Sequence, residues 1–184
     1  MLKRNNQLFF VLVILVGMVT LILPNNSQAV ESLAGKGKVS TSLSYSYIDI
    51  EDADDPVEVT NFLGEFGYFV TDHIEINFSP LVTSVDTGDS DSTIYSVFVN
   101  GKYNFYKRGW NSVPYAGLQA GITGVDTEGY DDSTFSFGGM AGFKQFLTES
   151  ISFNLEGNYM YYEVENTDVN QFSLFLGFTW YFGG

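Results

Sequence analysis

The feature that most constrains this chain is a two-residue alternation of apolar and small polar side chains. Between Lys38 and Tyr47 the odd positions hold valine, threonine, leucine and tyrosine, whereas the even positions hold lysine and serine. Successive side chains of a β-strand point to opposite faces, so this period predicts a strand with one apolar and one polar face. Similar segments predict eight strands, over residues 38–47, 59–70, 74–82, 93–105, 113–123, 134–146, 151–161 and 170–182.

One strand–turn–strand segment occurs twice. Residues 69–77 and 146–154 align without a gap and share an aromatic residue, an aliphatic residue, Thr, an acid, then Ile and finally Asn. Alternating apolar residues on both sides of a short polar turn predict a β-hairpin. Its repetition indicates a fold built from one supersecondary unit used several times. We expect the shared Asn77 and Asn154 on the polar face.

The connections between the predicted strands alternate in kind. The first, third, fifth and seventh are longer and hold 16 of the 22 acidic residues; they span 49–58, 86–91, 126–132 and 163–168. The second, fourth and sixth are short. In an up-and-down meander, alternate connections lie at opposite ends. The sequence therefore predicts one acidic end with loops of about six to ten residues and one tight-turned end, which is the plan of transmembrane barrels.

The N-terminus resembles a secretory signal peptide. Lys3 and Arg4 precede an apolar run from Leu8 to Leu23, and small residues precede a possible cut after Ala29. An uncleaved membrane anchor is the alternative, because the run is almost long enough for a span. We predict a signal peptide over 1–29 and a mature domain over 30–184, beginning with a short polar lead at 30–35. The absence of cysteine excludes a disulfide framework and a lipoprotein attachment site.

The charge of the chain excludes some partners. Removal of Lys3 and Arg4 changes the formal charge from −14 to −16. Nucleic-acid binding requires basic faces, so we expect no nucleic-acid partner.

The apolar faces are too bulky for the inside of a barrel. They carry many of the 17 Phe and 12 Tyr residues, whereas the polar faces consist largely of Ser, Gly, Asn, Gln and Thr. An eight-stranded barrel holds its interior side chains tightly. Aromatic residues facing lipid and small polar residues facing inward resolve this, and closure satisfies every backbone group. The prediction is an all-β, eight-stranded antiparallel transmembrane barrel; a soluble exported barrel is the alternative.

From residue 36 to 182 the chain resembles the small eight-stranded outer-membrane barrels of the OmpA/OmpX type. The most specific match is Gly177-x-x-Trp180-x-Phe182, which is similar to the family's C-terminal assembly signal. Phe175, where a polar residue is usual, and the trailing Gly183-Gly184 depart from that pattern. The resemblance implies a Gram-negative outer membrane, recognition by the barrel-assembly machinery and contact with lipopolysaccharide.

Six charged residues fall on the polar faces by parity: Lys38, Glu65, Glu75, Lys102, Lys144 and Glu156. Unpaired buried charge is costly, so we expect these three cations and three anions to pair as a plug inside the barrel. A gated or leaky polar path through the same residues is the alternative, although so narrow a barrel leaves little room for a channel.

Two further groups of residues have the chemistry of functional sites. His73 lies with Asp72 and Glu75 near a tight turn, whereas a lipid-modifying enzyme would place its catalytic groups at the other end, so we expect a rim residue. The acidic segments 51–55 and 86–91 offer oxygen ligands, but neither has EF-hand spacing. We predict solvated charge there, with divalent cations bridging to lipopolysaccharide as the alternative, and no catalytic, cofactor or metal site.

The sequence thus favours a non-enzymatic outer-membrane barrel with a structural or surface-interaction role. A narrow channel for ions or small solutes and a lipid-modifying enzyme are its rivals. Two features fit the pattern poorly. Pro80 predicts a bulge or an early strand end, because proline removes a ladder hydrogen bond. Phe98, Leu63 and Phe69 point inward by parity, which predicts either an apolar layer in the lumen or a shifted register.

Overall fold

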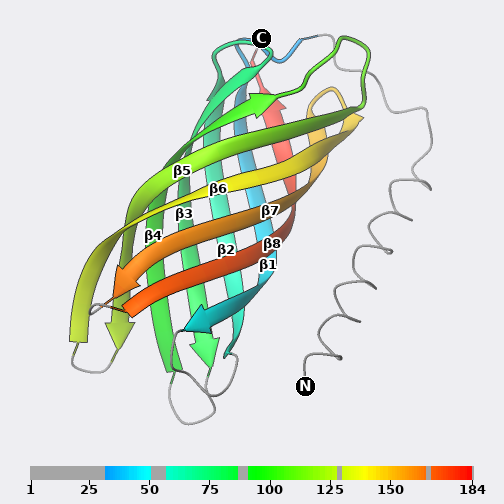
Figure 1. The fold of residues 1–184 in the computed structure, drawn as a ribbon. Coiled ribbons are helices and arrows are strands. Elements are labelled where there is room, and N and C mark those ends of the chain that lie inside the picture. The colour runs from blue at the N-terminus through cyan, green and yellow to red at the C-terminus, as the bar shows by residue number, and fades with distance from the viewer. Residues whose placement is uncertain (1–31, 51–56, 87–90, 128–129, 165–166, 184) are drawn as a thin grey trace.

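The protein is a closed barrel of eight antiparallel strands in chain order (Figure 1). The computed structural model describes residues 32–50, 57–86, 91–127, 130–164 and 167–183. The predicted signal peptide lies outside these ranges. The described residues include no helix long and apolar enough to cross a membrane. The strands are β1 Gly37–Ile50, β2 Val57–Phe69, β3 Ile74–Asp86, β4 Asp91–Asn104, β5 Ser112–Thr127, β6 Tyr130–Thr148, β7 Ile151–Val164 and β8 Thr167–Phe182.

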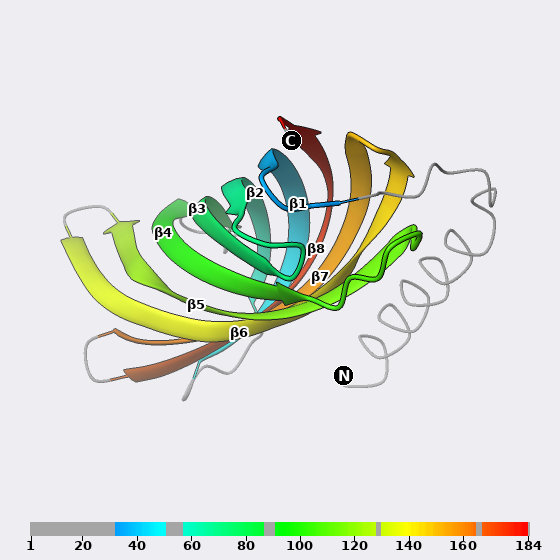
Figure 2. The ribbon, with the colours of Figure 1, turned by 90° about the horizontal axis from the view of Figure 1, so that it is seen from above.

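The first and last strands close the barrel. β1 pairs with β8 from Gly37 opposite Phe182 to Ile50 opposite Val169, and Figure 2 shows the curved wall from above. Closure leaves no sheet edge, so the backbone groups of the strands are paired within the wall, as a lipid environment requires. The described pairs keep one register per hairpin, except for a shift between Phe146 and Thr148 on β6.

The two ends of the barrel differ. The connections β2–β3, β4–β5 and β6–β7 lie at the end that also holds the C-terminus, which we name the turn end; the opposite end is the loop end (Figure 1). The predicted loop lengths were wrong for the acidic connections. The strands run on until only residues 51–56, 87–90, 128–129 and 165–166 separate them. Several acids therefore lie in paired strand ends rather than in loops.

Pro80 neither ends β3 nor introduces a bulge, so that prediction was wrong. The pairing of β3 with β4 continues without a break through Pro80, which lies opposite Val97. On the β2 side the pairing lapses locally, yet Leu63–Leu81 and Phe66–Phe78 keep the same register on either side of the lapse. The barrel tolerates the missing N–H because the long ladders before and after Pro80 hold the strands in place.

The outer wall is apolar and the lumen is mostly polar. On the outside, Leu118 is 75% exposed and Phe135 is 64% exposed. On the inside, asparagine, serine, threonine, lysine and glutamate side chains are buried, including Asn77 and Asn154 of the repeated hairpin. This arrangement is the reverse of a soluble barrel, which would expose its polar face to water. It places the apolar wall against lipid.

Parity also holds for the three inward aromatic and aliphatic residues. Phe98, Leu63 and Phe69 are all buried in the lumen, without a register shift in β2 or β4. The predicted apolar layer is therefore confirmed, and there are two of them. The luminal positions of β2 run from Val59 and Leu63 in one cluster, past Glu65, to Phe69 in the other. Charge thus lies between two apolar layers.

Candidate functional site

Six charged side chains meet in the middle of the lumen. Their ion pairs form an unbranched chain of alternating sign, which we call the luminal charge chain. Lys102 Nζ lies 2.9 Å from Glu65 and 2.7 Å from Glu156, and Lys38 contacts both Glu65 and Glu75. Lys144 contacts Glu75. The order is therefore Lys144, Glu75, Lys38, Glu65, Lys102, Glu156, and its formal charge is zero.

Six strands each contribute one residue to the luminal charge chain, and a seventh strand contributes Tyr115, which contacts both of its ends. Tyr115 on β5 donates its hydroxyl hydrogen to Glu156 Oε2 at 2.8 Å. The ammonium groups of Lys102 and Lys144 lie over its ring, at 4.9 Å and 4.8 Å from the centroid. Tyr115 therefore links the two ends of the chain. It was missed as a site residue, although its inward parity on a strand rich in alanine and glycine was a usable signal.

Glycines opposite the long side chains provide the space that they need. Gly67 pairs with Lys38 across β1 and β2. A Cβ atom at Gly67 would lie 1.8 Å from Asn77 Oδ1 and 2.7 Å from Lys38 Cε. Gly117 faces Lys102 in the same way, with Lys102 Cγ at 3.1 Å from a Cβ placed there. At Gly67 the Asn77 and Lys38 side chains therefore occupy the space that a larger residue would take, whereas at Gly117 the closest atom is the Gly101 carbonyl oxygen, at 2.6 Å.

The lumen has almost no free volume at the charge chain. The cavity lined by Lys38, Glu65, Lys102, Tyr115 and Glu156 measures about 10 Å³, which is close to the space that one water molecule needs. The apolar cluster on the loop side includes Phe98 and Phe175, and the cluster on the turn side includes Phe69 and Phe146. Phe175, the departure from the family pattern, is thus a packing residue of the first cluster.

The segment before β1 closes the turn end. We name residues 32–36 the N-terminal turn. Lys36 N donates to Leu33 O at 3.1 Å and Gly35 N donates to Phe69 O at 2.9 Å. Gly35 has a φ of 78°, which glycine adopts without strain. The fully buried Leu33 packs against Phe69, Val113, Phe146 and Tyr181. The prediction of a short polar lead at 30–35 was therefore wrong for its described part.

Asp72 anchors the N-terminal turn. Its Oδ1 accepts hydrogen bonds from Ser32 Oγ at 2.8 Å, from Leu33 N at 2.6 Å and from Ala34 N at 2.9 Å. Burial raises the pKa of Asp72, but these hydrogen bonds together outweigh it and hold the pKa below its ordinary value of 3.8. Asp72 belongs to the repeated hairpin, in which the Thr71 hydroxyl accepts the His73 N–H and the Thr148 hydroxyl accepts the Ser150 N–H.

His73 lies at the rim of the turn end and is exposed. Its Nδ1 lies 3.0 Å from Asn104 O, and its ring stacks on Tyr103 at a centroid distance of 5.6 Å. The neighbouring carboxylates are engaged elsewhere, since Asp72 binds the N-terminal turn and Glu75 is in the charge chain. The geometry holds His73 as a packed surface residue.

The C-terminal strand places Trp180 and Phe182 on the outer wall at the turn end, where they are 46% and 57% exposed. Gly177 faces inward, and a Cβ atom there would lie 2.2 Å from both Thr41 O and Ser42 Oγ. Close contact with β1 therefore explains the glycine. Recognition of these three residues by the assembly machinery stays a prediction. Of the acidic segments, 51–55 and the interior of 86–91 lie outside the described residues, and the described residues contain no cluster of three potential metal ligands.

Comparison with protein families decides the class. The model of the outer membrane protein beta-barrel domain family matches residues 13–182, which is nearly the whole chain. The chain belongs to this family. This outer-membrane β-barrel protein has no significant match among curated proteins.

Solved structures share the fold of this outer-membrane β-barrel protein. The Neisserial surface protein A is 18% identical, with a TM-score of 0.62, and the match covers 80% of this chain and 99% of that one. OprG of Pseudomonas aeruginosa is 16% identical over 86% and 100% of the two chains, with a TM-score of 0.59. Ail, the attachment invasion locus protein of Yersinia pestis, is 15% identical over 80% and 99%, with a TM-score of 0.53.

Proposed function

We propose that this protein is a non-enzymatic outer-membrane barrel with a structural or surface-interaction role and a lumen that does not conduct. In this proposal the chain is exported through a signal peptide removed after Ala29. The observation that carries the proposal is the luminal charge chain, whose six members neutralise one another between two apolar layers. A water-filled pore would need charged groups that face open solvent, whereas here the residual cavity is about 10 Å³.

The rival function is a narrow channel for ions or small solutes, and single-channel recording separates the two. Purified protein in a planar bilayer is expected to give no stepwise currents, because both apolar layers and the charge chain would have to part for an ion to pass. A general porin inserted under the same conditions serves as the positive control. Reproducible unit steps from the folded barrel would overturn the closed-lumen proposal.

The geometry of His73 supports the non-enzymatic part of the proposal. Its ring is engaged with Asn104 and Tyr103 at the turn end. The competing hypothesis, a lipid-modifying enzyme, predicts altered lipid A in cells that overproduce the protein. We expect the lipid A mass spectrum to be unchanged.

Divalent cations bridging the loop end to lipopolysaccharide form a further part of the proposal. The strand register supports it, because in three hairpins the backbone positions of two acids are paired: Asp86 and Asp91, Asp126 and Asp131, and Glu163 and Asp168. Directly opposed like charges destabilise a strand pair. Calcium shared with a lipopolysaccharide phosphate would remove that repulsion, since carboxylate oxygens are ligands that Ca²⁺ prefers.

This part predicts a calcium-dependent stability. In vesicles containing lipopolysaccharide, Ca²⁺ is expected to raise the unfolding temperature above its value in EDTA, measured by heat-dependent gel mobility. The matched variant combines D91N, D131N and E163Q, which leaves one acid in each pair. It should be more stable than the parent in EDTA, by about 0.2–1 kcal/mol for each pair relieved, and should respond less to Ca²⁺. An equal calcium response in both proteins would contradict the proposed calcium bridge.

A further inference from the structure

The charges outside the lumen are segregated between the two ends of the barrel. In the described residues, the lysines and arginines that do not belong to the charge chain are Lys36, Lys107 and Arg108. All three lie at the turn end, which faces the periplasm in the plan of outer-membrane barrels. Among the described acidic residues outside the charge chain, Asp72 and Glu149 lie at the turn end and the others lie toward the loop end. The β4–β5 turn, residues 105–111, holds two of the three cations and no acid, so it offers positive charge to the leaflet that surrounds it.

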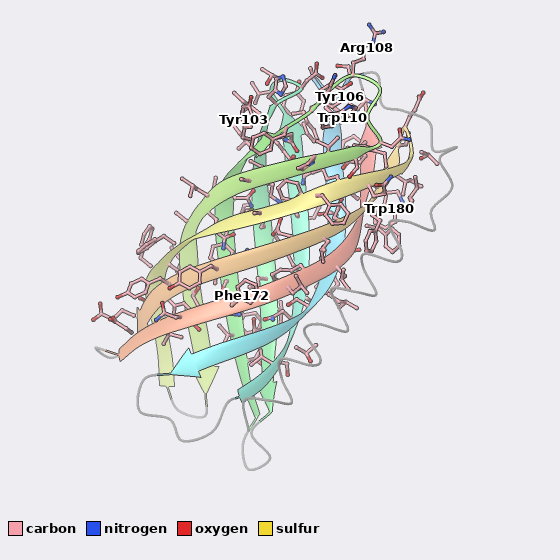
Figure 3. The ribbon with its side chains drawn as sticks, turned by 45° about the vertical axis from the view of Figure 1, so that its right-hand side comes forward. Tyr103, Tyr106, Arg108, Trp110, Phe172 and Trp180 are labelled. Atoms are coloured by element: carbon pink, nitrogen blue, oxygen red, sulfur yellow. The ribbon has the colours of Figure 1, made fainter. Side chains whose placement is uncertain are left out.

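The β4–β5 turn holds two of these cations beside aromatic residues at the edge of the apolar wall. Trp110 N donates to Lys107 O at 3.0 Å, and Gly109 has a φ of 85°, so the turn is tight and defined. Lys107 Nζ lies 5.7 Å from the centroid of the Trp110 ring. Figure 3 shows Arg108 projecting beyond Trp110, Tyr106 and Tyr103 at this end of the barrel.

The aromatic residues set the depth of the two cations. Tyr103, Phe105 and Trp110 are 49%, 53% and 44% exposed on the outside. Tyrosine and tryptophan rings at the end of an apolar wall lie at the level of the lipid headgroups. Lys107, held over the Trp110 ring, therefore lies at the depth of the lipid phosphates, with Arg108 next to it. Such basic residues attract anionic headgroups.

We propose that Lys107, Arg108 and Trp110 of the β4–β5 turn bind the phosphate of an anionic phospholipid headgroup in the periplasmic leaflet. Lys107, which lies over the Trp110 ring, supplies the charge that selects an anionic lipid over a zwitterionic one, and Arg108 adds to it. Trp110 supplies the apolar surface for the start of the acyl chains. The occupant is a membrane phospholipid rather than free phosphate, because the site opens onto the apolar wall of the barrel.

The protein contains its own matched control. Trp180, on β8, lies at the turn end on the opposite side of the barrel and is 46% exposed, close to the 44% of Trp110. Among the described residues, no cation lies over the Trp180 ring, whereas Lys107 lies over that of Trp110. The sequence has 2 Trp residues. The variants W180F and W110F therefore each leave a single fluorescent reporter, one inside the proposed site and one outside it.

Fluorescence quenching by brominated lipids tests the proposal. Each variant is reconstituted in vesicles of one fixed mixture of phosphatidylcholine and phosphatidylglycerol, with bromine on the chains of either one lipid or the other. The two quenching values give the local preference for the anionic lipid. At Trp110 we expect a preference of about fivefold or more, since one basic residue near the surface contributes about that factor. At Trp180 we expect a clearly smaller ratio, because Lys36 is the one described cation next to the β1–β8 end.

Charge removal completes the test. Adding K107Q and R108Q to W180F should lower the preference at Trp110 to near one, while heat-dependent gel mobility shows that the barrel is folded. The single change K107Q should give an intermediate value. Equal ratios at the two tryptophans would overturn the proposal, because aromatic anchoring without headgroup selection explains them. A preference for the anionic lipid at Trp110 that stays unchanged in the K107Q and R108Q double variant would also overturn the proposal.

Discussion

Replacing Glu75 by glutamine is expected to lower the free energy of unfolding by about 3–5 kcal/mol, the usual loss when one partner of a buried ion pair is removed. The size of the loss follows from its place in the charge chain. Lys144, at the end of the chain, has Glu75 as its acidic partner among the described residues. Without Glu75, the Lys144 ammonium group remains buried and uncompensated.

The control is the same substitution at the next acidic residue of the luminal charge chain. Glu65→Gln changes the charge equally, yet Lys38 keeps Glu75 and Lys102 keeps Glu156. We expect a smaller loss, about 1–3 kcal/mol, the cost of leaving buried polar groups poorly satisfied. Urea unfolding in vesicles, followed by tryptophan fluorescence, measures both. Combining E75Q with K144M should recover part of the loss. Equal losses for the two single variants would contradict the linear order of the chain.

Replacing Asp72 by alanine is expected to detach the N-terminal turn while leaving the barrel closed. Asp72 Oδ1 accepts three hydrogen bonds from this turn, and hydrogen bonds to a charged group each contribute about 1.5–3 kcal/mol. Hydrogen exchange at the Leu33 and Ala34 amides should therefore accelerate strongly. Exchange in the middle of the strands should change little.

The repeated hairpin supplies the control for this prediction. Glu149 occupies the position equivalent to Asp72 and is exposed. Glu149→Ala should leave exchange at Leu33 unchanged; a similar acceleration in both variants would mean that the acid acts through the turn and not through the contact.

The same contact predicts a dependence on pH. Because the pKa of Asp72 is lower in the folded protein than its ordinary value of 3.8, the turn is held most firmly above that value. The hold is lost as the pH falls below 3.8 and the carboxylate gains a proton. Protection of the Leu33 amide should fall in this range in the parent and stay low throughout in D72A.

The architecture was largely predictable because it depends on whether a residue occupies an odd or an even position along its strand. A strand residue faces either lipid or lumen, so alternation alone assigns Lys38 and Glu65 to the inside and Leu43 and Phe62 to the outside. Parity also identified Phe98 as luminal, and the structure then showed why an aromatic residue fits there. Strand ends were harder to predict. Asp126 and Asp131 resemble loop residues in composition, but the β5–β6 ladder continues through both.

The order of contacts within the lumen was beyond sequence analysis. Lys144 on β6 meets Glu75 on β3 across the barrel. Such a contact depends on the tilt and stagger of strands that are not neighbours, and these quantities leave no local pattern. The N-terminal turn was missed for a similar reason. Leu33 stands alone among small and polar residues, so no periodicity shows that it is buried.

The position of Leu33 also bears on the order in which the protein folds. Its neighbours Phe69, Val113, Phe146 and Tyr181 come from β2, β5, β6 and β8, so its pocket exists only when strands from both halves of the sequence have met. The pairing of β1 with β8 joins the most distant strands of the chain, and distant contacts form slowly. We therefore expect Leu33 to enter its pocket after the barrel has closed. The N-terminal turn, which precedes every strand in the sequence, would then be among the last segments to reach its native place.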